Sequence, residues 1–134
     1  MKVEFISNAG FVLTLRDGRV LVTDPWVNGG AYYGSWFNYP PVSDDLVERY
    51  ASLRPDWIYI SHVHPDHLDP KALRRYPSDT PILIGRLPHR DLHRSVSQLG
   101  FTQTVELALG EPTEIDGVEV TILNQFATVG GGYE

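Results

Sequence analysis

The chain has 134 residues, of which 42% are hydrophobic and 21% are charged, as in one ordinary globular domain. This composition excludes a disordered chain and a fibrous repeat. Eleven Lys and Arg against seventeen Asp and Glu give a net charge of −6, which argues against nucleic acid or an anionic membrane as a partner. Without a signal-like N-terminus or a run of about 20 apolar residues, we expect a cytoplasmic protein.

The first part of the chain predicts three short strands joined by tight turns. Residues 3–6 and 11–15 suit strands, and Arg16–Arg19 carries the Asp-Gly pair that is typical of a hairpin turn. Residues 20–23 are apolar on both faces, which favours an interior strand. This strand runs into Asp24, and an acidic side chain at the end of a buried strand needs a partner.

Residues 27–42 predict a long loop that is rich in glycine, proline and aromatic residues. Its aromatic content argues against disorder, and loops of this length inside compact domains are often functional. Two interpretations stay open. The loop either contacts a substrate or forms a flap that buries its own aromatic side chains.

The rest of the chain alternates between helices and strands. Ser43 and Asp69 suit helix N-caps, and Gly100 suits the residue that ends a helix. We expect helices at 44–54, 70–76 and 88–99 and strands at 57–60, 82–84, 104–107, 112–115 and 118–123. Strands first, followed by strands that alternate with helices, indicate a single α/β domain over residues 1–134 with a mixed sheet.

Three of the five histidines and two carboxylates lie within eight residues, directly after the fourth predicted strand. Because alternate side chains of an extended segment share a direction, His62 and His64 can both reach one cation. Pro65 forces a turn that brings Asp66 and His67 to the same cavity. Four ligands on so short a stretch fit two neighbouring metal positions better than one. His62 and His64 would hold one ion, and Asp66 and His67 the other.

Such a pair of positions predicts hydrolytic chemistry. Two ions about 3.5–4 Å apart can share a hydroxide and stabilise both the attacked and the leaving oxygen. In this hypothesis Asp66 is the catalytic residue that orients the hydroxide or accepts its proton. The chain has no Cys, so His, Asp and Glu must supply the ligands. A lone histidine usually has no ligand role, but four potential ligands at the end of a strand favour metal binding.

The run His62-Val63-His64-Pro65-Asp66-His67 resembles the signature of the metallo-β-lactamase-fold superfamily. The three N-terminal strands and their spacing to the run fit the same family. The resemblance implies an αβ/βα sandwich, of which this chain is the N-terminal half, with the metal site at an edge between two sheets. It implies one or two Zn²⁺ ions, with Mn²⁺ or Fe as variants. It also assigns His62 and His64 to the first metal, and Asp66 and His67 to the second.

The same resemblance implies residues that support the ligands. Asp24 would brace the motif loop. Ser61 and Asp69 are further candidates, because ligating imidazoles usually donate their other N–H to an acceptor. For Asp69 we favour the alternative role of a helix N-cap.

Two further runs, Thr23-Asp24-Pro25-Trp26 and Gly34-Ser35-Trp36-Phe37, are similar to one branch of the superfamily. That branch includes L-ascorbate-6-phosphate lactonase and the CMP-N-acetylneuraminate hydroxylase-like proteins. It implies a sugar-phosphate or nucleotide-sugar substrate, and the general hydrolase hypothesis adds a small ester or lactone. Four residues are candidates to hold it, with a solvated helix face as the alternative for the arginines. They are Trp26, Trp36, Arg86 and Arg90.

A complete member of this superfamily carries a further His, a bridging Asp and a final His, and this chain does not supply them. His89 and His93 follow too closely behind the cluster, and the expected third-motif position holds Gln125, Phe126 and Thr128. Three explanations stay open: a piece of a longer enzyme, an assembly of two copies, or a catalytically silent metal binder. Half a sandwich would expose an apolar face, so we expect a homodimer or a missing C-terminal half.

The leading functional hypothesis is therefore a metal-dependent hydrolase, with the chain's own enzymatic activity left open. A non-haem iron redox enzyme is the first alternative, because a site with only nitrogen and oxygen ligands also suits iron. A non-catalytic metal-binding or interaction module of the same fold is the second.

Overall fold

The computed structural model describes residues 1–88 and 90–123, which form a mixed α/β fold as the sequence predicts. The helices are α1 (Asp44–Ala51), α2 (Pro70–Leu73) and α3 (Asp91–Gln98), with a 3₁₀ turn, η1, at Tyr32–Gly34. The strands are β1 (Lys2–Ser7), β2 (Gly10–Thr14), β3 (Val20–Thr23), β4 (Trp57–Ile60), β5 (Ile82–Gly85), β6 (Thr104–Leu107), β7 (Thr113–Ile115) and β8 (Val118–Val120).

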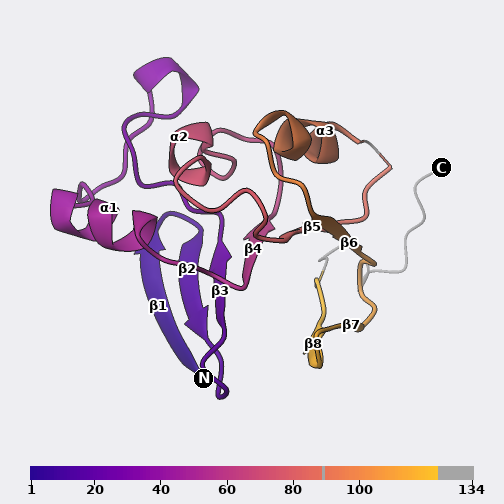
Figure 1. The fold of residues 1–134 in the computed structure, drawn as a ribbon. Coiled ribbons are helices and arrows are strands. Elements are labelled where there is room, and N and C mark those ends of the chain that lie inside the picture. The colour runs from indigo at the N-terminus through magenta and orange to yellow at the C-terminus, as the bar shows by residue number, and fades with distance from the viewer. Residues whose placement is uncertain (89, 124–134) are drawn as a thin grey trace.

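Strands β1 to β6 form one sheet in their order along the chain (Figure 1). β1, β2 and β3 are antiparallel, and the turn before β3 is closed by Asp17, whose carboxylate accepts from the backbone N–H of Arg19. β3, β4, β5 and β6 are parallel. Parallel strands end at the same edge, so the segments that follow β3, β4 and β5 meet there.

The face of the sheet that the helices cover holds the larger core. Apolar side chains of the helices, including Leu73 and Val96, belong to one buried cluster with alternate residues of the strands. β-Branched side chains suit such a pleated, buried surface. The isoleucines that β4 and β5 contribute are Ile58, Ile60, Ile82 and Ile84.

The opposite face of the sheet is only partly covered. The β7–β8 hairpin packs its apolar side chains against a smaller core that includes Trp57, Leu83 and Leu107. A cavity of about 360 Å³ lies between the sheet and the segment that follows β8. On β1 the side chains of Val3 and Phe5 are 55% and 59% exposed. The strand register places a continuous row on this face, consisting of Phe5, Phe11, Thr23, Tyr59, Leu83 and Val105.

Several boundaries differ from the sequence prediction, including the end of β8, which lies at Val120 instead of residue 123. α3 starts at Asp91 instead of residue 88, because Pro88 lies in a bend before the helix. α2 stops at Leu73, and shorter-range backbone bonds of the kind that tighten a last helical turn continue to Tyr76. Ser43 occupies the N-cap position of α1 as expected, but its side chain makes no capping hydrogen bond. His89 and the predicted third-motif residues Gln125, Phe126 and Thr128 lie outside the described residues.

Among residues 1–88 and 90–123, no helix has the length and apolar character that crossing a membrane would require.

Candidate metal centre

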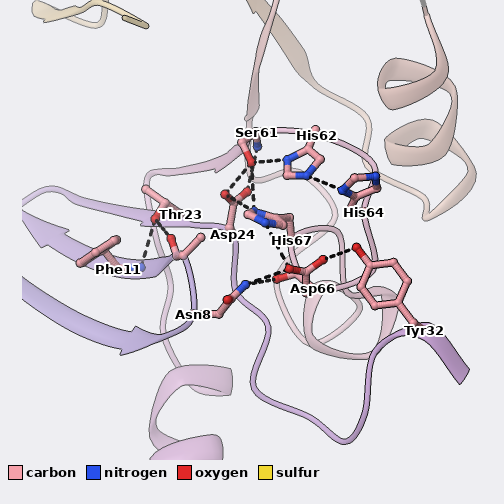
Figure 2. A network of polar contacts seen from close by, with 11 residues as sticks. Asn8, Phe11, Thr23, Asp24, Tyr32, Ser61, His62, His64, Asp66 and His67 are labelled. Carbon is pink, nitrogen blue, oxygen red and sulfur yellow. Dashed lines mark hydrogen bonds and ion pairs between the residues drawn. The ribbon is translucent and has the colours of Figure 1, made fainter. Parts of the chain in front are cut away.

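The candidate centre lies where β3 and β4 end side by side (Figure 2). Asp24 follows β3 directly, and its backbone N–H donates to the carbonyl of Tyr59 on β4 over 2.9 Å. The chain bends here with a φ of 37° at Asp24, a conformation that Asp tolerates better than most residues. The bend turns the Asp24 carboxylate toward Ser61, the first residue after β4.

The buried Asp24 carboxylate has hydrogen-bond partners, as expected for an acidic side chain at the end of a buried strand. Its Oδ1 accepts from the backbone N–H of Ser61 over 2.8 Å, and its Oδ2 accepts from the Ser61 hydroxyl over 2.7 Å. Its Oδ2 also lies 2.9 Å from Nδ1 of His67. An acceptor at Nδ1 fixes the ring so that Nε2 is left with the lone pair that a metal needs. Asp24 therefore orients His67 from behind.

The imidazoles of the His-rich segment come together as the sequence predicts. Ser61 Oγ lies 2.9 Å from Nδ1 of His62 and 3.1 Å from Nδ1 of His67. The ring centroids of His62 and His67 are 4.0 Å apart, and those of His62 and His64 are 4.5 Å apart. Nε2 of His62 and Nδ1 of His64 are separated by 2.9 Å. These two nitrogens form the first pair of potential ligands.

A tight turn supplies the second pair. The backbone N–H groups of His67 and Leu68 both donate to the carbonyl of His64, over 2.9 and 2.8 Å. The turn around Pro65 brings Asp66 back toward the imidazoles. Its Oδ2 lies 3.4 Å from Nε2 of His67.

Two residues that sequence reasoning missed hold the Asp66 carboxylate. Asn8, in the turn between β1 and β2, donates from Nδ2 to Oδ2 of Asp66 over 3.1 Å and to its backbone carbonyl over 3.2 Å. The Tyr32 hydroxyl donates to Oδ1 over 2.9 Å. An Asn with a φ of 48° is normal turn chemistry, so nothing in the sequence separates Asn8 from an ordinary turn residue. Tyr32 lies in the predicted aromatic loop, where no feature of the sequence separates it from the other aromatic residues.

The protonation states favour metal binding. Burial alone would raise the pKa of Asp66, but hydrogen bonds from Tyr32 and Asn8 and the nearby His67 lower it below its usual range. Burial and the neighbouring imidazoles lower the pKa of His62. Burial and the Asp66 carboxylate raise the pKa of Tyr32. At neutral pH the site therefore offers a carboxylate, a neutral imidazole and a protonated phenol, and a metal binds the first two forms.

The donors fit a metal as two pairs. Zn–N distances of about 2.0–2.1 Å place two ligand nitrogens of a tetrahedral ion about 3.3 Å apart, so the His62 and His64 nitrogens need to open only slightly. Among residues 1–88 and 90–123, no three His, Asp or Glu side chains form a group that could hold an ion by itself. Each pair can therefore supply half of a four-ligand shell, and the other ligands must be water or groups outside the described residues.

The predicted substrate-binding residues do not gather at one place in the structure. Trp26 is only 1% exposed, so its indole lies in the core and presents no surface to a substrate. Trp36 is 54% exposed, with its ring centroid 6.0 Å from that of Tyr32. Arg86 is exposed directly after β5, and Arg90 forms an exposed ion pair with Glu106. Substrate contact by Trp36 and the two arginines stays a prediction.

Asp69 caps α2. Its Oδ1 accepts from the backbone N–H of Lys71 over 2.9 Å. Its Oδ2 is buried without a hydrogen-bond partner in the described part of the chain, and burial raises the pKa of the carboxyl. These contacts favour the cap over a role in supporting the ligands.

Comparison with known protein families identifies the family of this chain. The family described as the beta-lactamase superfamily domain matches residues 2–134. The chain belongs to this family. The metallo-β-lactamase fold predicted from the His-rich run is thereby confirmed.

Curated relatives of this metallo-β-lactamase-family chain are much longer than it is. One from Mycolicibacterium smegmatis, named "Putative Rieske 2Fe-2S iron-sulfur protein", is 42% identical over 102 residues, which is 75% of this chain and 19% of that protein. The cytidine monophosphate-N-acetylneuraminic acid hydroxylase of Pongo pygmaeus is 32% identical over 107 residues, which is 78% of this chain and 18% of the hydroxylase. The predicted likeness to the CMP-N-acetylneuraminate hydroxylase-like proteins is confirmed. The chain spans about a fifth of the length of these relatives.

Solved structures show the same fold in enzymes of two kinds. An isothiocyanate hydrolase from Delia radicum gut bacteria matches with a TM-score of 0.62 and 22% identity, over 87% of this chain and 44% of the hydrolase. CmlA, a diiron β-hydroxylase from Streptomyces venezuelae, matches with a TM-score of 0.60 and 23% identity, over 91% of this chain and 23% of CmlA. The fold therefore includes a metal-binding enzyme, and at these identities the likeness concerns the fold alone.

Proposed function

We propose that this chain carries the ligand-bearing part of a metal-dependent hydrolase that acts on a small ester, lactone, or phosphorylated or nucleotide-sugar substrate. The observation that carries the proposal is the convergence of two donor pairs, His62 with His64 and Asp66 with His67. Zn²⁺ is the first candidate for the ion, and Mn²⁺ and Fe are the others. When bound, such an ion acts as a Lewis acid and lowers the pKa of a coordinated water toward about 7.

The chain's own residues have separate roles in this proposal. His62 through Nε2 and His64 through Nδ1 would hold one ion. His67 through Nε2 and Asp66 through Oδ2 would hold the second. Asp24 keeps Nδ1 of His67 engaged, so that Nε2 stays available. The Asp66 carboxylate, which is ionised at neutral pH, would accept a proton from the attacking water.

A non-haem iron redox enzyme is the second candidate. It is supported by the 32% identity to a hydroxylase over 78% of this chain. Histidine and carboxylate ligands with open positions also suit iron. The two candidates share the ligand residues and differ in the ion and in the need for oxygen.

Metal binding by the full 134-residue chain is the first test. We expect elemental analysis to find bound Zn, Mn or Fe in the purified protein and His64→Ala to weaken binding at least about 10-fold. His93→Ala is the matched control, because His93 lies on α3 outside the cluster and its loss should leave binding unchanged. A wild-type chain that binds no metal would refute both enzyme candidates and favour the non-catalytic module.

The native ion and the cofactor requirement then separate the two enzyme candidates. Hydrolysis of ester, lactone and phosphoester substrates in the absence of oxygen supports the hydrolase. Bound iron together with turnover that stops when oxygen is removed supports the redox enzyme.

A further inference from the structure

Tyr32 joins the aromatic loop to the candidate metal centre. Its hydroxyl donates to Oδ1 of Asp66 over 2.9 Å, and its ring centroid lies 6.1 Å from that of His64 (Figure 2). The loop is pinned just beside it, because the backbone of the buried Ala31 pairs with that of Trp36. The N–H of Ala31 donates to the carbonyl of Trp36 over 2.9 Å. Tyr32 is thus held at the base of a closed turn.

Burial of the aromatic ring does not account for the position of Tyr32. Tyr32 is 37% exposed, whereas the adjacent Tyr33 is fully exposed. The backbone at Tyr32 has a φ of 49°, a conformation that an L-residue with a large side chain adopts at some cost. Its polar contact is with a carboxylate, and hydrogen bonds to ionised acceptors are the stronger class. The hydroxyl is therefore the part of Tyr32 that the site uses.

The two oxygens of Asp66 are held differently. Oδ1 is fixed by Tyr32, and Oδ2 accepts from Asn8 while it faces Nε2 of His67. The terminal torsion of an Asp side chain has a broad energy profile, so the plane of a free carboxylate turns easily. Donors on both oxygens set that plane and direct Oδ2 toward His67.

We propose that Tyr32 is a positioning residue for Asp66, and that it couples the 27–42 loop to metal affinity at the position formed by Asp66 and His67. This inference rests on the proposed metal site. Coupling is reciprocal: a metal that uses Oδ2 of Asp66 stabilises the arrangement in which Oδ1 accepts from Tyr32, and so restrains the loop.

Zinc affinity of matched tyrosine variants tests the proposal. Competition with a chromophoric chelator gives the Kd for Zn²⁺ of the wild type, Tyr32→Phe and Tyr33→Phe. We expect Tyr32→Phe to weaken binding about 10-fold, as removal of a partner of a metal ligand typically does. Tyr33→Phe, one residue away and without a contact to Asp66, should match the wild type.

A double-mutant cycle shows whether the effect passes through Asp66. In an Asp66→Ala background the remaining zinc binding should be unchanged by Tyr32→Phe, because the acceptor of the hydroxyl is already gone. A merely structural role of Tyr32 would lower affinity equally in both backgrounds and would overturn the proposal.

Fluorescence of Trp36 reports the loop directly. We expect Zn²⁺ to change the emission of the wild type, with Trp36→Phe identifying the indole responsible and Tyr32→Phe abolishing the change. Equal zinc affinity and equal fluorescence response in Tyr32→Phe and the wild type would overturn the role of Tyr32 and leave the metal site in place. A wild-type chain that binds no zinc or other metal would overturn both.

Discussion

Asp24 is the residue on which the arrangement of the candidate centre depends most directly. One carboxylate contacts the backbone and hydroxyl of Ser61 and Nδ1 of His67, and it lies fully inside the protein. Ser61 extends the contact to Nδ1 of His62. The buried Asp24 carboxylate thus orients His67 directly and His62 through Ser61.

Asp24→Asn tests this dependence with little change in shape. The amide can still accept from the N–H of Ser61, and Asn tolerates the positive φ of this position. Its NH₂ group cannot accept from Nδ1 of His67, so we expect Zn²⁺ affinity to fall between about 10-fold and 100-fold. Chelator competition measures the change, and the exposed Asp79→Asn is the control. An affinity equal to that of the wild type would contradict the role of Asp24.

Sequence reasoning found the candidate ligands but not the residues that hold Asp66. His62, His64, Asp66 and His67 are close in the chain, so a local pattern reveals them. Asn8 is 58 residues from Asp66, and its approach depends on how the β1–β2 turn meets the His-rich turn. A local sequence pattern does not show which residues that are distant in the chain lie close together in space.

Short elements with turn-forming residues at both ends were the most predictable. β3, β4 and β6 have the expected bounds, because each is a compact apolar run between turn residues. The order of the parallel strands in the sheet could not be predicted. It is set by the helices that cross between strands and pack on one face, which is a property of the tertiary structure.

The start of α2 tests whether Asp69 serves the helix or the metal centre. Asp69→Ala removes the acceptor for the N–H of Lys71, so we expect the free energy of unfolding to fall by about 1 kcal/mol. Asp69→Ser should recover most of this loss, because Ser is also a good N-cap. Urea unfolding measures both variants.

The same two variants should bind Zn²⁺ as the wild type does. A loss of metal affinity in Asp69→Ala that Asp69→Ser does not recover would show that Asp69 supports the ligands after all.

At the scale of the whole molecule, the uncovered part of the sheet is the feature with the clearest consequence. In Figure 1 the β7–β8 hairpin lies near β5 and β6, away from β1 and β2. Val3 and Phe5 on β1 and Phe11 on β2 are exposed on this face of the sheet. The rings of Phe5 and Phe11 are 5.4 Å apart and form an apolar cross-strand pair. Contiguous apolar surface of this kind is typical of faces that contact other protein surface.

We expect the isolated 134-residue chain to associate with a second copy through this face. Sedimentation velocity over a range of concentrations should show a dimer or larger species, and Phe5→Lys should shift it toward the monomer. Phe37→Lys is the control, because Phe37 is equally exposed but lies on the 27–42 loop. A concentration-independent monomer in the wild type would contradict the expectation.

The candidate centre draws its polar groups from four separate stretches of the chain: the β1–β2 turn, the end of β3, the aromatic loop and the segment after β4. None of these stretches can complete the arrangement before the neighbouring strands have found their register. An ion bound there would therefore stabilise the tertiary structure that joins these four stretches, and it could bind only after they have come together. Its release would destabilise the contacts between the elements before it destabilised any single strand or helix.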